Sequence, residues 1–141
     1  MTEIATNKKL IFTGEDLINP RMAVESKKMN KFFPQIRFYA SGGTVTSVQG
    51  YLKTSYGNSY YIKIAISSEY PYEKPTITLP NTTIKAGCPH KFVNDTICVM
   101  KAEQWSSTYS LAFMVAKTAL WVNKYDLWQR KGYWAGKGQP H

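Results

Sequence analysis

The spacing of hydrophobic residues in the first part of the chain predicts a helix. Apolar side chains recur at three- and four-residue intervals between positions 20 and 32, and Pro34 ends the pattern. Asn19 followed by Pro20 is typical of a helix N-cap and a first helical residue. We therefore predict a helix over about residues 20–32. The apolar face of this helix is predicted to carry Met22, Met29, Phe32 and Phe33.

The period then changes to an alternation of apolar and polar residues, which is typical of half-buried strands. The alternation runs over residues 35–40, 44–54 and 60–66, and a fourth apolar segment covers 76–79. Gly57-Asn58 favours a tight hairpin because both residue types tolerate a positive φ. These segments predict a four-stranded antiparallel meander.

No periodicity is visible from position 80 to about 106, and a connection of that length is usually functional. Helical spacing returns afterwards and continues to about residue 130, where Gly132 supplies a stop signal. We therefore expect an α+β fold with an N-terminal helix, the meander, a long active-site loop and a C-terminal helix. One domain is predicted over 1–141, with its core at about 20–130. A tail is predicted at 132–141, and Tyr133 and Trp134 at its start are expected to act as an aromatic anchor.

Composition and charge narrow the classes of protein. The 43% apolar content of the 141 residues is that of a globular protein. Eighteen basic and nine acidic residues give a net charge of +9, which favours an acidic partner, although the basic residues are scattered. No apolar stretch is long enough to span a membrane, and the first twenty residues lack a signal-peptide pattern. With only two cysteines, a cytoplasmic location is expected.

Candidate chemistry is concentrated in the loop, which contains Cys88, His90 and Cys98. The two thiols could be buried apolar fillers, or they could pair in a disulfide, which a reducing cytosol disfavours. The three residues could also bind a metal ion, but a structural zinc site needs a fourth ligand, and the nearest unassigned candidate is His141. A nucleophilic cysteine with a polar helper is the fourth interpretation. The residues alone leave these interpretations open.

A resemblance in the second half of the chain favours the nucleophile. The segments YPYEKP, CPH, NDTIC and QWSS occur in an order and spacing similar to those of the ubiquitin-conjugating enzyme family, over roughly residues 36–125. In that family the nucleophilic cysteine follows a His-Pro-Asn triplet, and a tryptophan turn comes next. Here Cys98 lies ten positions after Cys88, and Trp105 follows. The resemblance implies a ubiquitin-conjugating-enzyme-like fold and thioester chemistry, with no cofactor and no metal.

The resemblance also implies roles for individual residues. Cys98 is the expected nucleophile, and His90 replaces the family's asparagine as a donor to the oxyanion, a role that can contribute about 3 kcal/mol. Cys88 occupies the place of a structural histidine. Asn94 and Asp95 could orient or deprotonate an incoming amine, or simply form a turn. Trp105 is expected to anchor the loop by packing.

The CPH triplet and the aromatic C-terminus resemble the divergent bacterial branch of the family, which is encoded in antiphage operons with cyclic-oligonucleotide signalling. This similarity implies a partner whose C-terminus is conjugated, either a ubiquitin-like protein or a cGAS-like nucleotidyltransferase. A separate activating enzyme is expected because 141 residues leave no room for an adenylation fold. No membrane partner is expected.

Two other functions remain open. The first is a non-catalytic binding module of the same fold. The second is a basic domain that binds single-stranded nucleic acid, which the resemblance does not favour. It would use Tyr39, Tyr51, Tyr56, Tyr60 and Tyr61 as stacking platforms.

Overall fold

The computed structural model describes residues 8–136 and has an α+β architecture. Two short 3-10 helices, η1 (Lys8–Leu10) and η2 (Gly14–Ile18), precede α2 (Arg21–Phe32). The strands are β1 (Arg37–Ser41), β2 (Thr44–Lys53), β3 (Ser59–Ala65) and β4 (Thr76–Thr78). A third 3-10 helix, η3 (Ala102–Gln104), precedes the long helix α3 (Leu111–Lys131). The predicted order of helix, four strands, loop and helix is confirmed.

The four strands form one antiparallel sheet in the order β1-β2-β3-β4, which confirms the predicted meander. Along β3 the residues Tyr60, Ile62 and Ile64 are buried, and the residues between them are partly exposed, as the alternation requires. The turn between β2 and β3 is wider than the predicted tight hairpin. It extends from Thr54 to Asn58, and Gly57 alone adopts a positive φ, at 88°.

Helix α2 begins one residue later than predicted. Pro20 is its N-cap, and Asn19 instead follows the end of η2, where its side chain donates to the Glu15 carbonyl. Its buried face also differs from the predicted apolar one, because Glu25 and Lys28 are buried beside Val24 and Met29. Met22 and Phe32 are only half-buried.

Helix α3 has defined signals at both ends. The Ser110 hydroxyl accepts from the backbone N–H of Phe113 at 2.9 Å, which satisfies one of the free donors of the first turn. Gly132 has φ 81° and donates to the Trp128 carbonyl, and this left-handed residue ends the helix as predicted. The predicted face of α3 is buried along its length, at Leu111, Val115, Thr118, Val122 and Tyr125.

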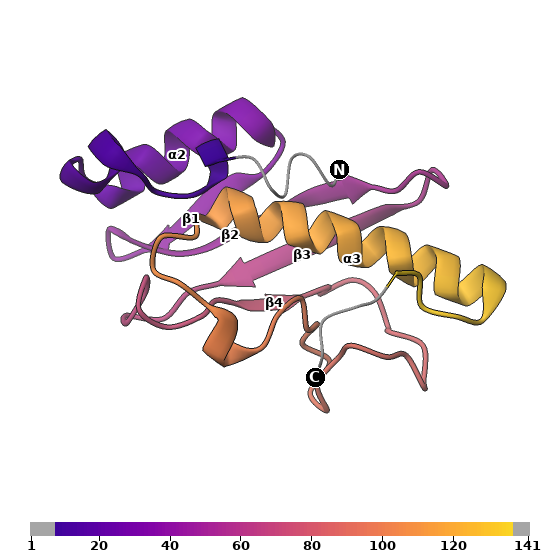
Figure 1. Ribbon diagram of the computed structural model, residues 1–141. Helices are drawn as coiled ribbons and strands as arrows, with labels where there is room; N and C mark the ends of the chain where they lie inside the picture. Colours follow the sequence, from indigo (N-terminus) through magenta and orange to yellow (C-terminus); the bar gives the residue numbers. More distant parts are fainter. Residues whose placement is uncertain (1–7, 137–141) are drawn as a thin grey trace.

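Helix α3 lies across one face of the sheet, and the hydrophobic core fills the space between them (Figure 1). Helix α2 packs against α3 beyond the β1 end of the sheet. The connection from β4 to α3 runs along the opposite edge of the sheet. Within the part of the chain that the structure describes, no helix is long and apolar enough to cross a membrane.

Candidate active site in the loop between β4 and α3

The centre of the loop is a turn that brings Lys91 and Ile97 together as a β-bridge. The backbone N–H of Phe92 donates to the Thr96 carbonyl at 2.8 Å, and that of Asp95 donates back to Phe92 at 3.1 Å. Asp95 adopts φ 62°, a left-handed conformation that aspartate tolerates better than most residues. The chain therefore reverses here and returns toward the sheet.

Cys98 lies where the returning chain meets the sheet. The N–H of Ile97 donates to Ile77 of β4 at 2.9 Å, and the N–H of Cys98 donates to the His90 carbonyl at 2.9 Å. The Cys98 thiol contacts the Met100 carbonyl at 3.5 Å, and the residue is 6% exposed. Backbone hydrogen bonds thus hold this cysteine in one place, beside the edge strand.

Opposing influences act on the Cys98 thiol. Burial has the largest effect and holds its pKa above the ordinary value, because a thiolate is poorly solvated there, whereas the Lys74 cation, the Met100 backbone and the Lys101 cation oppose that rise. Lys74 is half-buried, and burial lowers the pKa of its ammonium, while a Cys98 thiolate would raise it. The sequence pattern did not point to Lys74, because Lys74 lies in the segment 70–75, and this segment is separated from the loop that contains Cys98. Lys74 precedes Cys98 by 24 positions.

His90 is connected to Cys98 through its backbone. Its carbonyl accepts from the Cys98 N–H and from the indole N–H of Trp121 on α3, each at 2.9 Å. The residue adopts φ 59°, and its ring lies against Trp134, with the ring centroids 5.0 Å apart. Trp134 in turn contacts Trp121, as expected of an aromatic anchor, whereas Tyr133 is 57% exposed.

Cys88 is a second buried thiol near the same turn. Burial raises its pKa to about 11, against a smaller opposing effect of Lys91, and its thiol contacts the Pro89 carbonyl at 3.2 Å. The two cysteines do not form a disulfide with each other. Among residues 8–136 no three His, Cys, Asp or Glu side chains are grouped as metal ligands, and His141 lies outside that range. The higher pKa makes Cys88 the poorer nucleophile.

Asn94 and Asp95 contact residues of the turn itself. The Asn94 side-chain oxygen accepts from the Thr96 hydroxyl at 2.8 Å, and the Asp95 carboxylate pairs with Lys91 at 3.0 Å. Both residues are exposed. These contacts favour the turn-forming interpretation over a direct role with an amine.

Trp105 holds the C-terminal end of the loop against the segment that precedes β4. Its indole N–H donates to the Pro71 carbonyl at 2.8 Å, beside the cis peptide bond between Tyr70 and Pro71. Its ring packs between Tyr70 and Tyr109. These contacts agree with the expected packing role.

A buried network that the sequence did not reveal positions the same segments. The Glu25 carboxylate accepts from Tyr70, from Arg21 at 3.1 Å and from the first backbone N–H of α3, at Leu111, at 2.8 Å. Arg21 also donates to the carbonyls of Ser107 and Tyr109 at 2.6 and 2.8 Å. Helix α2 is thereby attached to the segment that precedes β4 and to the end of the connection between β4 and α3.

Comparison with known families identifies the chain. The model of a family described as Type II CBASS E2 protein, E2-CBASS, matches residues 25–141, which include the whole loop and both cysteines. The chain belongs to the E2-CBASS family. No curated protein sequence gives a significant match. Membership confirms the resemblance to ubiquitin-conjugating enzymes of CBASS antiphage operons, and it indicates an E2-like role with partners in that system.

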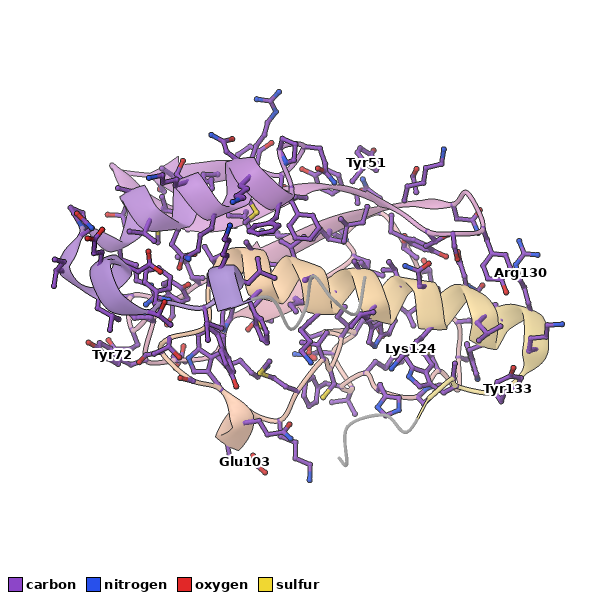
Figure 2. All side chains as sticks on the ribbon, turned by 45° about the horizontal axis from the view of Figure 1, so that its top comes forward. Tyr51, Tyr72, Glu103, Lys124, Arg130 and Tyr133 are labelled. Carbon is purple, nitrogen blue, oxygen red and sulfur yellow. The ribbon has the colours of Figure 1, made fainter. Side chains whose placement is uncertain are left out.

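The α+β architecture of this E2-CBASS protein is compatible with an E2-like fold. Its tyrosines do not form one continuous platform. Tyr51 projects outward from the sheet (Figure 2) and packs edge-on against Tyr61 of β3. Tyr39 is also exposed, whereas Tyr60 is buried and Tyr56 lies under the guanidinium of Arg130.

Proposed function

We propose that this E2-CBASS protein is an acyl transferase in antiphage defence, with Cys98 as its nucleophile. The deprotonated thiol attacks the activated C-terminal carbonyl of a protein partner, and the activating group leaves with its electron pair. A thioester results. An amine, such as a lysine side chain, then attacks that carbonyl, loses a proton, and displaces Cys98 as the thiolate. The partner is a ubiquitin-like protein or a cGAS-like nucleotidyltransferase.

The observation that carries this proposal is the setting of Cys98. Its backbone N–H donates to the His90 carbonyl, the adjacent residue Ile97 is bound to the edge strand, and Lys74 and Lys101 oppose the rise in pKa that burial causes. A thiolate near positive charge is the reactive form of cysteine. Cys88 lies in the same loop, but its pKa of about 11 leaves it almost entirely protonated at neutral pH. The family match adds the expectation of an E2-like role.

The C-terminal carbonyl of the partner must be activated before Cys98 attacks it. We take a separate activating enzyme to supply that activation. We place the reaction in the cytoplasm, where thiols remain reduced. Asn94 and Asp95 are assigned to shaping the turn that presents Cys98, in line with their contacts to Thr96 and Lys91.

Expression with the neighbouring genes of the operon tests the proposal. A covalent adduct that dithiothreitol removes is expected on a non-reducing gel, since a thioester exchanges with small thiols. The adduct should disappear in Cys98→Ala and persist in the matched variant Cys88→Ala. Absence of an adduct with every neighbour, or its persistence in Cys98→Ala, would favour the non-catalytic binding module of the same fold.

His90 is proposed to donate a hydrogen bond from its ring to the oxyanion. The hydrogen bond from the Cys98 N–H to the His90 carbonyl supports a role of this residue at the same site. His90→Ala should slow transfer roughly a hundredfold, the usual loss for one such donor. His90→Asn should retain most of the rate, because asparagine keeps a donor and tolerates the φ of 59°. Single-turnover transfer rates measure both, and an unchanged rate in His90→Ala would remove this role.

One observation favours the nucleic-acid alternative. Tyr51 and Tyr61 share the outer face of the sheet with the exposed residue Lys53 and with Lys63 of β3, so aromatic and basic groups are combined there. Titration of a fluorescent single-stranded oligonucleotide tests this second function. The nucleic-acid function requires binding that weakens steeply with salt and that is reduced in Tyr51→Ala. The control is Tyr133→Ala, a change at another exposed tyrosine.

A further inference from the structure

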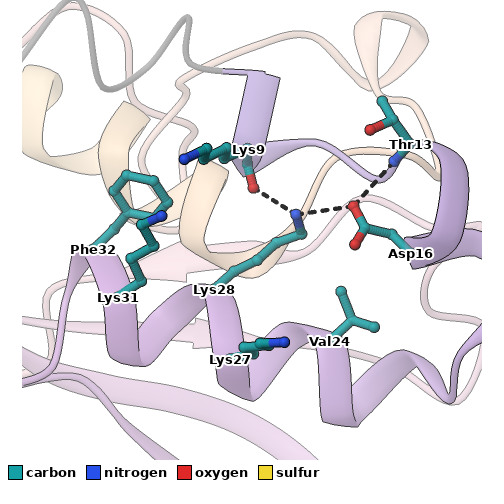
Figure 3. Close-up of a pocket in the computed structure, with 8 residues that line it drawn as sticks. All are labelled: Lys9, Thr13, Asp16, Val24, Lys27, Lys28, Lys31 and Phe32. Atoms are coloured by element: carbon teal, nitrogen blue, oxygen red, sulfur yellow. Dashed lines mark hydrogen bonds and ion pairs between the residues drawn. The ribbon is translucent and has the colours of Figure 1, made fainter.

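A cavity of about 310 Å³ lies between the two N-terminal 3-10 helices and α2, and nothing in the proposed transfer reaction uses it. Its volume is at the lower end of the range of small-molecule sites. Four lysines and a single carboxylate line it (Figure 3). They are Lys9, Lys27, Lys28 and Lys31, with Asp16 as the carboxylate.

One of the four lysines is committed to the protein. The Lys28 ammonium donates to the Lys9 carbonyl and pairs with the Asp16 carboxylate at 3.1 Å, and the residue is buried. Its charge and that of Asp16 therefore offset each other within the wall of the cavity. Lys9, Lys27 and Lys31 add three positive charges to the lining of the cavity, in which Asp16 is the single carboxylate among the described residues.

Two of these positive charges face each other. Figure 3 shows the side chains of Lys9 and Lys31 ending close together at one side of the cavity. Contact with the Lys9 ammonium lowers the pKa of Lys31, which is the effect of one positive charge on another. An anion between the two groups would relieve this repulsion.

The wall beside the lysines is apolar. Phe32 and Val24 line the cavity, and the Lys31 ammonium lies 5.7 Å from the centroid of the Phe32 ring. A ligand with both a charged and a flat apolar part would fit such a surface. The small extent of this open cavity, which eight residues line, favours a small molecule over an acidic protein face, which would need a broader surface.

We propose that this cavity binds the phosphate groups of a nucleotide, with Lys9, Lys27 and Lys31 as the phosphate contacts and Phe32 against the base. The site is separate from the Cys98 loop. In Figure 1 helix α2 lies on the far side of α3 from the connection that carries Cys98. The proposal therefore stands independently of the thioester reaction, and its test needs no transfer activity.

Isothermal titration of the full chain with ATP and with inorganic pyrophosphate, at about 150 mM salt, tests the site. Binding of both is expected. The double variant Lys27→Gln/Lys31→Gln should weaken each at least tenfold, because charge-assisted hydrogen bonds are lost. The matched control is Lys85→Gln/Lys131→Gln, which removes the same charge at two exposed positions outside the cavity and should change affinity less than about twofold.

Three results would overturn the proposal. One is no binding of ATP or pyrophosphate at millimolar concentration by protein whose circular dichroism is that of a folded chain. A second is equal weakening in the control variant, which would reveal only diffuse attraction to a chain of charge +9. The third is tighter binding of an oligoglutamate peptide or a single-stranded oligonucleotide than of ATP, with the same dependence on Lys27 and Lys31.

Discussion

At the scale of single residues, the reactivity of Cys98 depends on groups that surround it. Burial disfavours the thiolate, and Lys74 and Lys101 favour it. Lys74 is itself half-buried, and its ammonium lies 5.8 Å from the Phe92 ring centroid, so its charge is less screened than that of an exposed lysine. We therefore regard Lys74 as the cation that contributes most to stabilising the Cys98 thiolate.

Replacing this cation should make Cys98 less reactive. In a Cys88→Ala background, Lys74→Met should raise the pKa of Cys98, and alkylation below that pKa should slow severalfold because the thiolate fraction falls. The rate of iodoacetamide reaction between pH 7 and 10 measures this shift. Lys53→Met, an exposed change on β2, should leave the profile unaltered. Coincident profiles for Lys74→Met and its parent would contradict the assigned role.

At the scale of elements, the connection between β4 and α3 is positioned by a buried carboxylate. Glu25 on α2 is fully buried and binds Tyr70, in the segment that precedes β4, and Leu111, where the connection ends. Burial raises the pKa of Glu25 in spite of its partners, because the charged form loses its hydration. The junction of the two helices therefore contains a titratable group.

This group predicts a pH dependence of stability. The pKa of Glu25 in the folded protein lies above its ordinary value of 4.5, so the folded state binds the proton more tightly than the unfolded state. The contribution of Glu25 to the free energy of unfolding is therefore fully present below about 4.5 and falls as pH rises through the raised pKa. Urea unfolding of wild type and Glu25→Gln across pH 4 to 8 should show a difference that declines with pH.

A matched variant isolates that effect. Glu103 projects from η3 at the surface (Figure 2), and Glu103→Gln should give a constant difference from wild type over the same range. If Glu25→Gln also gave a constant difference, the raised pKa of Glu25 would be wrong.

At the scale of the whole molecule, a second buried carboxylate attaches the far end of the sheet to α3. Asp126 is 2% exposed and accepts hydrogen bonds from Thr54, from Tyr60 and, at 3.1 Å, from Asn58. These donors belong to the turn between β2 and β3 and to its flanks, and they precede Asp126 by 66 to 72 residues. The long helix and the meander are therefore linked at the end opposite α2.

Loss of the Asp126 charge should destabilise the fold. Asp126→Asn retains the shape of the side chain but replaces one accepting oxygen by an amide donor, which then faces either Tyr60 or both Thr54 and Asn58. We expect the free energy of unfolding to fall by about 2 kcal/mol. Asp95→Asn makes the same change in an exposed turn and should cost less than about 1 kcal/mol. Urea unfolding measures both changes. Equal losses of unfolding free energy in the two variants would show that the buried Asp126 network adds nothing to stability.

The order of elements could be predicted because periodicity reports local geometry. Alternation placed the four strands, helical spacing placed the buried face of α3, and Gly132 marked the end of that helix. The resemblance to the ubiquitin-conjugating enzymes, now supported by the family match, rested on the order of Tyr70-Pro71, Cys98 and Trp105. The single domain over residues 1–141 and the assigned site residues stay predictions.

The sequence by itself determined which backbone segments form, where the nucleophile candidate stands in the chain and how much positive charge the protein carries. Only the tertiary structure decided which groups share a site. Lys74 is placed beside Cys98, Glu25 beside Tyr70, and Lys9 beside Lys31 by the packing of elements that are distant in the chain. The spacing of residues along the chain cannot reveal such pairs, because charge and burial at a point in space depend on every element that meets there.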